Sequence, residues 1–305
     1  MIGTNQNPLL NLPLPELLSL ANTVREEHIG QNLELCSIIN AKSGLCSEDC
    51  KFCAQSSKHT SQVNTYSLKS RKEIVQAAGK AKEIGAEKFG IVTSGNRLTS
   101  KELEEIVAAA LEIKEKIGIS VCGSLGALKR SALVRLKKVG LSRYHHNIET
   151  SRRFYPEIVS THTFQERVDT VKAAKDVGMQ VCSGGIIGLG ETWQDRVDMA
   201  ITLRDLGVDS VPINLLVPMA GTPLASVKPL SANDAIRTIC IFRIILRDKI
   251  IKIAAGRESV LGDSQKLGFM AGANGMLIGG YLTIKGRDLK EDRSLVEEIR
   301  ALWKK

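Results

Sequence analysis

The sequence predicts an α/β fold, a single (β/α)8 barrel of the TIM type with an N-terminal helical extension and a C-terminal helix. Three observations support this prediction. From about residue 33 onward, short β-branched or apolar runs alternate with longer segments of helical periodicity. Eight such runs follow one another within about 270 residues. No linker rich in Pro, Gly or Ser divides them, so one barrel fits better than two doubly wound domains.

Each element of this barrel has its own local signal. The expected strands are residues 33–39, 88–94, 119–124, 142–148, 180–186, 210–216, 250–256 and a weaker candidate at 275–280. The expected helices include residues 70–85, 99–118, 163–178, 193–207 and 231–248. Several helices open with Ser or Thr followed three residues later by Glu, or with Asp, and several end at Gly.

The two ends of the chain complete the predicted organisation. Residues 1–32 are expected to form a helical extension that covers one end of the barrel. Residues 33–305 are expected to form the barrel itself, with an amphipathic closing helix at 295–305.

Composition narrows the class of protein. The 305 residues are 43% hydrophobic and 25% charged, which is typical of a globular chain and not of a disordered or collagen-like one. No apolar run approaches the roughly 18–20 residues that cross a bilayer, and the N-terminus lacks an export signal. We therefore expect a cytoplasmic protein that does not enter a membrane.

The net charge is +9, from 42 Lys and Arg against 33 Asp and Glu. This surplus is compatible with nucleic acid, an anionic substrate or an acidic protein partner, and the sign of the charge does not choose among them. Nucleic acid is not expected, because only two Trp, four Tyr and six Phe are present and the basic residues form no dense cluster.

The strongest chemical signal is a group of cysteines. Cys46, Cys50 and Cys53 follow the first expected strand in a C-x3-C-x2-C spacing. The odd total of seven cysteines argues against a disulfide framework and favours thiolates that bind metal. Three thiolates on one loop suit a 4Fe-4S cluster with one open iron, and a zinc loop that borrows a distant ligand is the alternative.

At this point the motifs match a known family. A C-x3-C-x2-C loop after the first strand of such a barrel resembles the radical S-adenosylmethionine (SAM) enzymes, and over almost the whole chain the resemblance is to the biotin synthases. It is carried by GLCSEDCKFCAQSS (44–57), YHHNIETS (144–151), THTFQERVDTV (161–171), VCSGGIIGLGET (181–192), SVPINLLVPMAGTPL (210–224), AAGRE (254–258) and GFMAGANGMLIGG (268–280).

The resemblance implies a sulfurtransferase-type radical reaction. The open iron of the 4Fe-4S cluster is expected to bind SAM, which on reduction yields a 5′-deoxyadenosyl radical. That radical removes hydrogen from dethiobiotin, and sulfur is inserted to form biotin. The cofactors carry the hard step, and the protein orients the reactants and excludes water.

The resemblance also assigns residues to SAM and the substrate. Arg167 is expected to pair with the carboxylate of SAM. Asn147 and Glu149 are expected to face the ribose and the substrate, and Asn214 the ureido ring of dethiobiotin. The alternatives are an Arg on a helix surface and a structural amide at the end of a strand.

Two further features belong to the expected SAM site. Gly184 and Gly185 are expected to let the backbone approach SAM closely. Within 144–151 the chain departs from the usual family pattern YNHNLDTS, because His145 stands for Asn and Glu149 stands for Asp.

The sequence departs most from the family pattern at the ligands of a second iron-sulfur cluster. The resemblance implies a 2Fe-2S cluster held by three Cys and one Arg. Cys122 and Cys182 match two of these positions, whereas Gly90 and Lys252 stand where the third Cys and the Arg belong. A glycine supplies no ligand, and an ammonium has no lone pair for iron.

A barrel interior suggests a substitute, because the side chains of one layer come from alternate strands. Cys36, Cys122, Cys182 and Lys252 lie on the first, third, fifth and seventh expected strands. Our hypothesis is that the three cysteines hold an auxiliary cluster of 4Fe type, favoured over 2Fe-2S, with its fourth iron open or carrying an extra sulfide. In this hypothesis Lys252 neutralises its charge. The alternative is that Cys36 is a small core residue.

Several other expectations complete the interpretation. Cys240 is expected in the core, and His28, His59 and His162 on the surface or in loops. An acidic flavodoxin or ferredoxin is the expected electron donor, and the resemblance implies a homodimer. The competing functions are a related radical SAM enzyme, of the hydrogenase-maturation or methylornithine-synthase type, and a non-catalytic iron-sulfur or zinc protein.

Overall fold

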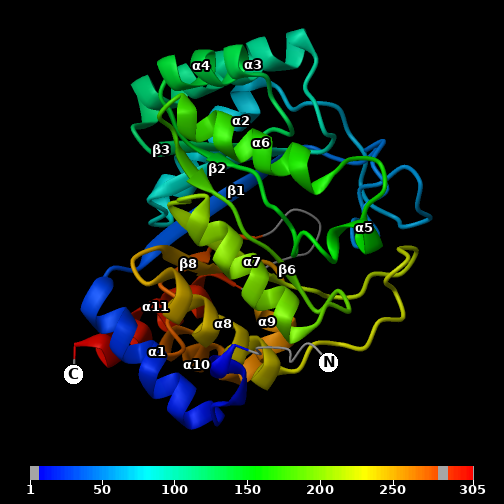
Figure 1. Ribbon diagram of the computed structural model, residues 1–305. Helices are drawn as coiled ribbons and strands as arrows, with labels where there is room; N and C mark the ends of the chain where they lie inside the picture. The colour runs from blue at the N-terminus through cyan, green and yellow to red at the C-terminus, as the bar shows by residue number, and fades with distance from the viewer. Residues whose placement is uncertain (1–6, 281–287, 305) are drawn as a thin grey trace.

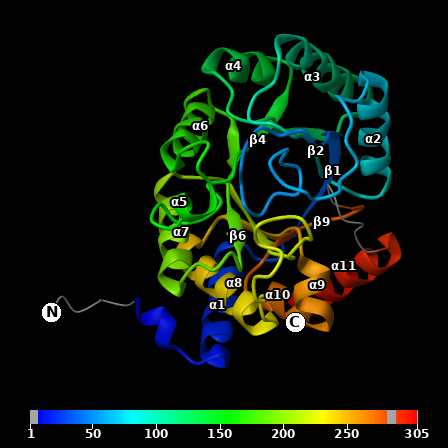
Figure 2. The ribbon, with the colours of Figure 1, turned by 90° about the vertical axis from the view of Figure 1, so that its right-hand side faces the viewer.

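The computed structural model describes residues 7–280 and 288–304 (Figure 1). Its strands form one parallel sheet in the order β5-β4-β3-β2-β1-β9-β8-β7-β6. A further pairing between β5 and β7 closes this sheet into a barrel. Helices surround the ring of strands (Figure 2), so the predicted (β/α)8 barrel is confirmed.

The strands lie close to the predicted segments. They are β1 (Glu34–Lys42), β2 (Lys88–Thr93), β3 (Ser120–Ser124), β4 (Leu141–His145), β5 (Gln180–Cys182), β6 (Gly185–Ile187), β7 (Ser210–Leu215), β8 (Ile250–Ile253) and β9 (Gly275–Leu277). One predicted strand, 180–186, is divided into β5 and β6. The reason is that the N–H of Gly184 donates to Oδ1 of Asn147 (3.2 Å) instead of continuing the ladder. The two short strands share one of the eight barrel positions.

The helices also follow the prediction, with additional short ones. Their bounds are η1 (Pro8–Asn11), α1 (Leu14–His28), α2 (Arg71–Glu83), α3 (Ser100–Glu112), a π-helical turn η2 (Ile113–Ile117), α4 (Arg130–Lys138), α5 (Tyr155–Ile158), α6 (Phe164–Asp176), α7 (Trp193–Asp205), α8 (Ala232–Leu246), α9 (Arg257–Leu261), η3 (Gly262–Ser264), α10 (Gln265–Met270) and α11 (Leu289–Trp303). Among these described helices, none is long and apolar enough to cross a membrane.

Capping chemistry sets where several helices begin. Ser70, Thr99, Thr163 and Thr192 each accept a hydrogen bond from the backbone three residues later, and the side chain there bonds back. This reciprocal pair satisfies two N–H groups that a helix leaves open at its start. The predicted capping signals are therefore confirmed.

The N-terminal extension lies against the flank of the barrel. Leu17 and Ala21 of α1 are fully buried, and α1 packs on α8 and α10. The guanidinium of Arg25 lies 4.5 Å from the ring centroid of Trp303, which ties α1 to α11. The segment after α1, around His28 and Asn32, borders the end of the barrel where the strands begin. Residues 1–6 of the predicted extension and residue 305 of the closing helix lie outside the described residues.

Candidate functional site

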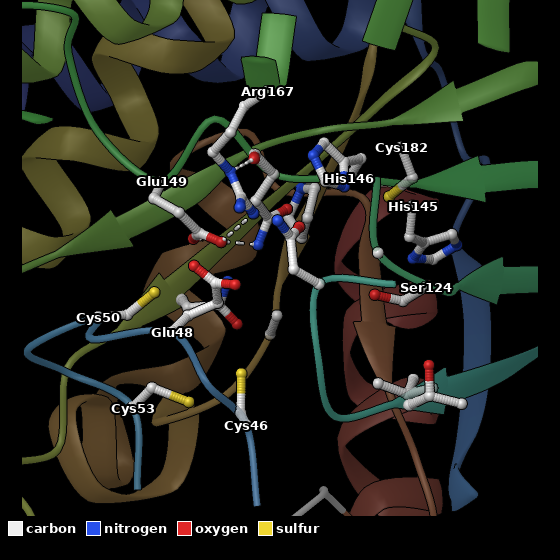
Figure 3. Close-up of a pocket in the computed structure, with 18 of the residues that line it drawn as sticks. Cys46, Glu48, Cys50, Cys53, Ser124, His145, His146, Glu149, Arg167 and Cys182 are labelled. Atoms are coloured by element: carbon white, nitrogen blue, oxygen red, sulfur yellow. Dashed lines mark hydrogen bonds and ion pairs between the residues drawn. The ribbon is translucent and has the colours of Figure 1, made fainter. Parts of the chain in front are cut away.

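A cavity of about 280 Å³ opens where the strands end. The loop after β1 supplies Cys46, Cys50 and Cys53 to its wall, and the segment after β4 supplies Asn147 and Glu149. Figure 3 shows the three cysteines and Glu149 around one space, together with Arg167 from α6. The carboxyl ends of barrel strands are where enzymes of this fold place their chemistry.

The cysteine loop is held by its own backbone. The N–H of Cys46 donates to the carbonyl of Gln55 (3.0 Å), and the N–H of Ser57 donates to the carbonyl of Cys46 (2.8 Å). The N–H of Cys53 donates to the carbonyl of Cys50 (2.9 Å). None of these bonds uses a thiol, so the three sulfur atoms stay available for ligation.

A second set of bonds joins this loop to the segment before α6. The carboxylate of Asp49 accepts from the backbone N–H of Ser160 (2.9 Å) and from the Thr161 hydroxyl (3.0 Å). Burial alone would raise the pKa of Asp49, but hydrogen bonds from the side chains and backbone of Ser160 and Thr161 hold it well below its usual value. Glu48 pairs with Nδ1 of His162 (2.9 Å). These contacts fix the position of the cysteine loop relative to His162, and through His162 relative to Arg167.

The raised pKa values of two of the loop thiols suit a site that binds iron. Burial, followed by the neighbouring Cys53 and Glu149, raises the pKa of Cys50, and burial is also the main cause that raises the pKa of Cys53 to about 11. Thiolates here need a compensating positive charge, which iron supplies. In the described residues, no three His, Cys, Asp or Glu side chains converge on a single ion. A 4Fe-4S cube does not require this, because each thiolate binds its own iron.

Arg167 lies at the centre of a polar network above the cysteine loop. Its Nη2 donates to Oε1 of Glu149 (2.8 Å), its Nη1 contacts Nε2 of His162 (3.0 Å), and its Nε donates to the carbonyl of Asn147. Three of its five N–H groups therefore have partners among the described residues, and the Tyr155 hydroxyl also interacts with this guanidinium. The alternative that Arg167 lies free on a helix surface does not hold.

Glu149 adopts an unusual backbone conformation. Its φ is +67°, in the left-handed region that non-glycine residues rarely occupy. Burial raises the pKa of its carboxyl, although Arg167 and Asn147 oppose the effect. Strained residues of this kind persist where the surroundings determine their position, and they cluster at functional sites.

The two glycines of the expected SAM site are packed against protein. A Cβ at Gly184 would lie 2.0 Å from the carbonyl oxygen of Pro212, and one at Gly185 would lie 2.3 Å from that of Glu149. Neither glycine lines the cavity as the structure describes it. Their close approach to SAM stays a prediction. In the structure, the absence of a side chain at these two positions allows the backbone of Pro212 and Glu149 to pack closely against them.

Asn214 lines the cavity and also joins two strands. Its Nδ2 donates to the carbonyl of Gly185 (3.1 Å), and its Oδ1 accepts from the N–H of Ala255 (3.3 Å). An amide has two donors and two lone pairs, so one of each is left for a ligand.

Deeper in the barrel lies a buried ionic cluster. Glu34 accepts from Nη1 and Nη2 of Arg143 (2.6 and 3.0 Å) and pairs with Nζ of Lys252 (2.7 Å). Lys252 also donates to Sγ of Cys36 (3.0 Å). Burial alone would raise the pKa of Glu34, but Lys252 and Arg143 lower it to about 2.

Three thiols surround this ionic cluster. Cys36, Cys122 and Cys182 are buried on β1, β3 and β5. Burial would lower the pKa of Lys252, but Cys36, Cys182 and Glu34 raise it above its usual value. Burial would raise the pKa of Cys122, but the adjacent His145 and the positive charges of Arg143 and Lys252 lower it. The barrel layer predicted from the sequence therefore brings these side chains to one region.

Comparison with known proteins decides the family. A model of the radical SAM superfamily matches residues 42–215, and a model of the biotin and thiamin synthesis associated domain matches residues 212–300. The biotin synthase of Thermotoga petrophila is 48% identical over 97% of this chain and 98% of its own length. That of Thermotoga neapolitana is 52% identical over 88% of this chain and 97% of its own length.

The chain belongs to the biotin synthase family. It is thus a radical SAM enzyme, and the expected resemblance is confirmed. Among solved structures, a methylornithine synthase superposes with a TM-score of 0.82 at 21% identity, over 97% of this chain and 94% of that one. The hydrogenase maturase HydG of Carboxydothermus hydrogenoformans superposes with a TM-score of 0.78 at 20% identity, over 93% of this chain and 70% of that one. Identities this low support the shared fold alone.

Some site residues of this biotin synthase family member did not emerge from the sequence. His162 lies in the loop before α6, one of the two placements expected for it, but it is buried against the cavity because the hydrogen bond from Ser160 to Asp49 holds this loop against the cysteine loop. Glu34 and Arg143 also belong to the site, with no motif around them that predicts it. Their signal was a charged residue inside an otherwise apolar strand, which a barrel interior tolerates only when the charge is paired.

The remaining assignments agree with expectation in part. Cys240 is fully buried in the apolar core, as predicted. His59 lies in the cysteine loop, where its Nε2 contacts the carbonyl of Cys50 (3.0 Å). The predicted roles of the site residues toward SAM, dethiobiotin and iron stay predictions.

Proposed function

We propose that this protein converts dethiobiotin to biotin by radical insertion of sulfur, using SAM and two iron-sulfur clusters. The observation that supports it most is one cavity bordered at its mouth by three loop thiols and at its base by Cys182 and Lys252. A substrate between these two sets of groups is within reach of both a radical source and a sulfur source.

The residues of the mouth have distinct tasks in this proposal. Cys46, Cys50 and Cys53 hold the 4Fe-4S cluster, which with SAM supplies the 5′-deoxyadenosyl radical. Arg167, which lines the cavity, offers its guanidinium to the carboxylate of SAM. Glu149 lines the cavity, and its carboxylate oxygens accept hydrogen bonds from the ribose hydroxyls of SAM.

The substrate has a matching set of polar groups. Asn147 and Asn214 present amides to the cavity, and a ureido ring offers both N–H donors and a carbonyl acceptor. Gly184 and Gly185 allow the backbone next to these amides to pack closely against Pro212 and Glu149. Dethiobiotin is therefore oriented by neutral hydrogen bonds, and no charge is required beside its ring.

An anaerobic single-turnover assay tests this function. Reconstituted protein is mixed with dethiobiotin, SAM and a strong reductant, and biotin and 5′-deoxyadenosine are quantified by mass spectrometry. Formation of both supports the proposal. Formation of 5′-deoxyadenosine without biotin contradicts the substrate assignment, and formation of neither contradicts the radical chemistry.

We further propose that Cys36, Cys122 and Cys182 bind an auxiliary cluster of 4Fe type, with Lys252 as its charge partner. The four side chains come from one interior layer, and Lys252 already donates to Cys36. Gly90 has no side chain and supplies no ligand. A Cβ added there would lie 3.0 Å from Cγ2 of Ile38 on β1. The donor set thus fits three thiolates and a cation.

The substitution Cys36→Ser tests this ligand set. We expect the iron content of the reconstituted protein to fall by about four atoms per chain, because the hydroxyl of serine is a much poorer iron ligand than a thiolate. The measurement is iron analysis combined with Mössbauer spectroscopy. Cys240→Ser, in the apolar core, is the matched control and is expected to keep all its iron. Full auxiliary iron in Cys36→Ser would show that Cys36 is a core residue only.

An acidic flavodoxin or ferredoxin is the proposed electron donor, since the chain carries a net charge of +9. We expect the rate of reduction by such a donor to fall at least about tenfold between low and high salt, because screening weakens electrostatic steering. Stopped-flow absorbance measures this rate, and a rate independent of ionic strength would contradict the proposal. A homodimer is proposed from the family resemblance and is checked by light scattering.

A further inference from the structure

The structure places His145 between two of the buried thiols. In the ladder between β4 and β5, His145 is the partner of Cys182. In the ladder between β3 and β4, Cys122 is the partner of Arg143, two residues before His145. Alternate residues of a strand point to the same face. Since Arg143 reaches Glu34 across the barrel, that face is the interior.

The close-up view agrees with this placement. Figure 3 shows the imidazole of His145 beside Cys182 and above Ser124. His145 lines the same cavity as Cys182 and Lys252. It is therefore within the region in which the auxiliary cluster is proposed, and it comes from a strand that provides no cysteine.

One nitrogen of this imidazole lacks a well-placed partner. Nε2 of His145 is buried and has no partner of good hydrogen-bond geometry among the described residues, although the imidazole lies close enough to the Cys122 thiol to lower the pKa of that thiol. A buried polar atom left unsatisfied costs about 1–3 kcal/mol, so native structures rarely keep one without a reason. Because its neighbours are thiols, a nitrogen lone pair here is suited to a metal.

Lys252 cannot serve in its place. Its Nζ is in an ion pair with Glu34 (2.7 Å) and donates to Cys36 (3.0 Å). An ammonium that donates in both contacts has no lone pair for iron. The three cysteines can bind three irons of a four-iron cluster, which leaves one iron without a ligand from the protein.

We propose that His145 binds this fourth iron through Nε2, as a fourth protein ligand of the auxiliary cluster. The inference rests on the proposed auxiliary cluster. The bond is dative: the nitrogen lone pair is shared with iron, Nδ1 keeps its hydrogen, and no electron or proton is transferred. A neutral imidazole gives the cluster one negative charge fewer than a fourth thiolate, and replacement of Cys by His raises the reduction potential of such clusters.

Pulsed electron paramagnetic resonance on the reconstituted and reduced protein tests this ligand directly. The protein is prepared with ordinary histidine and with histidine labelled with ¹⁵N in the ring. We expect a strong ¹⁴N coupling that changes to a ¹⁵N coupling on labelling. The triple variant Cys46→Ala, Cys50→Ala, Cys53→Ala is expected to retain it, which assigns the coupling to the auxiliary cluster.

Two histidine variants complete the test. His145→Gln is expected to lose the histidine coupling, whereas His146→Gln, the matched change at the next residue, is expected to keep it. A normal auxiliary signal without histidine coupling, or a coupling that survives in His145→Gln, would overturn the inference. If the triple variant holds no iron at all, the auxiliary cluster itself is refuted, and the inference with it.

Discussion

The substitution Cys50→Ala is expected to reduce the formation of 5′-deoxyadenosine by at least about a thousandfold. The reason is that the loss of one of three thiolates leaves a 4Fe-4S cluster with too few protein ligands to persist. The loop itself should stay folded, because its bonds run through the backbone, Gln55 and Asp49 and none of them uses the Cys50 thiol. The loss therefore reports on the cluster and not on the loop.

Mass spectrometry of 5′-deoxyadenosine under anaerobic reduction measures this effect, with iron analysis beside it. We expect the iron content to fall by about four atoms per chain. Cys240→Ala is the matched control: its side chain is buried in α8, away from the cavity, and its activity should equal that of the parent. Undiminished 5′-deoxyadenosine from Cys50→Ala would refute the assignment of the loop cysteines.

The second large effect is expected from Glu34→Gln. Glu34 is the shared carboxylate of Arg143 and Lys252, and all three side chains are buried. Removing one partner of a buried ion pair costs about 3–5 kcal/mol, because the remaining charge is left uncompensated. We expect a fall in the melting temperature on the order of 10 °C. A cluster held by anionic thiolates would compensate the two cations in part, so the fall should be larger before reconstitution than after it.

Thermal unfolding followed by circular dichroism measures this change, before and after anaerobic reconstitution. The matched control is Glu104→Gln, which makes the same chemical change in an exposed pair with Arg135. Exposed ion pairs contribute little, so its melting temperature should be that of the parent. If the melting temperature of Glu34→Gln equals that of Glu104→Gln, the ionic cluster does not stabilise the barrel.

The cysteine loop and the barrel layer show why part of the site was predictable. The C-x3-C-x2-C spacing places Cys46, Cys50 and Cys53 on one short loop whatever the rest of the chain does. The thiols of Cys36, Cys122 and Cys182 could be placed in one layer because strand order and side-chain alternation are regular in a barrel. Roles that depend on contacts between distant segments could not be found in this way.

Local sequence sufficed to predict the order of strands and helices, the capped helix starts and the thiol-rich loop, because these depend on neighbours within a few residues. The contact between Glu34 and Arg143, 109 residues apart, and the approach of His162 and Arg167 to the cysteines follow from the folded barrel instead. The folded barrel also places His145 opposite Cys182. The physical reason is that such pairs form only when barrel closure buries the charges together, and a buried charge must then be matched by whichever partner the register presents.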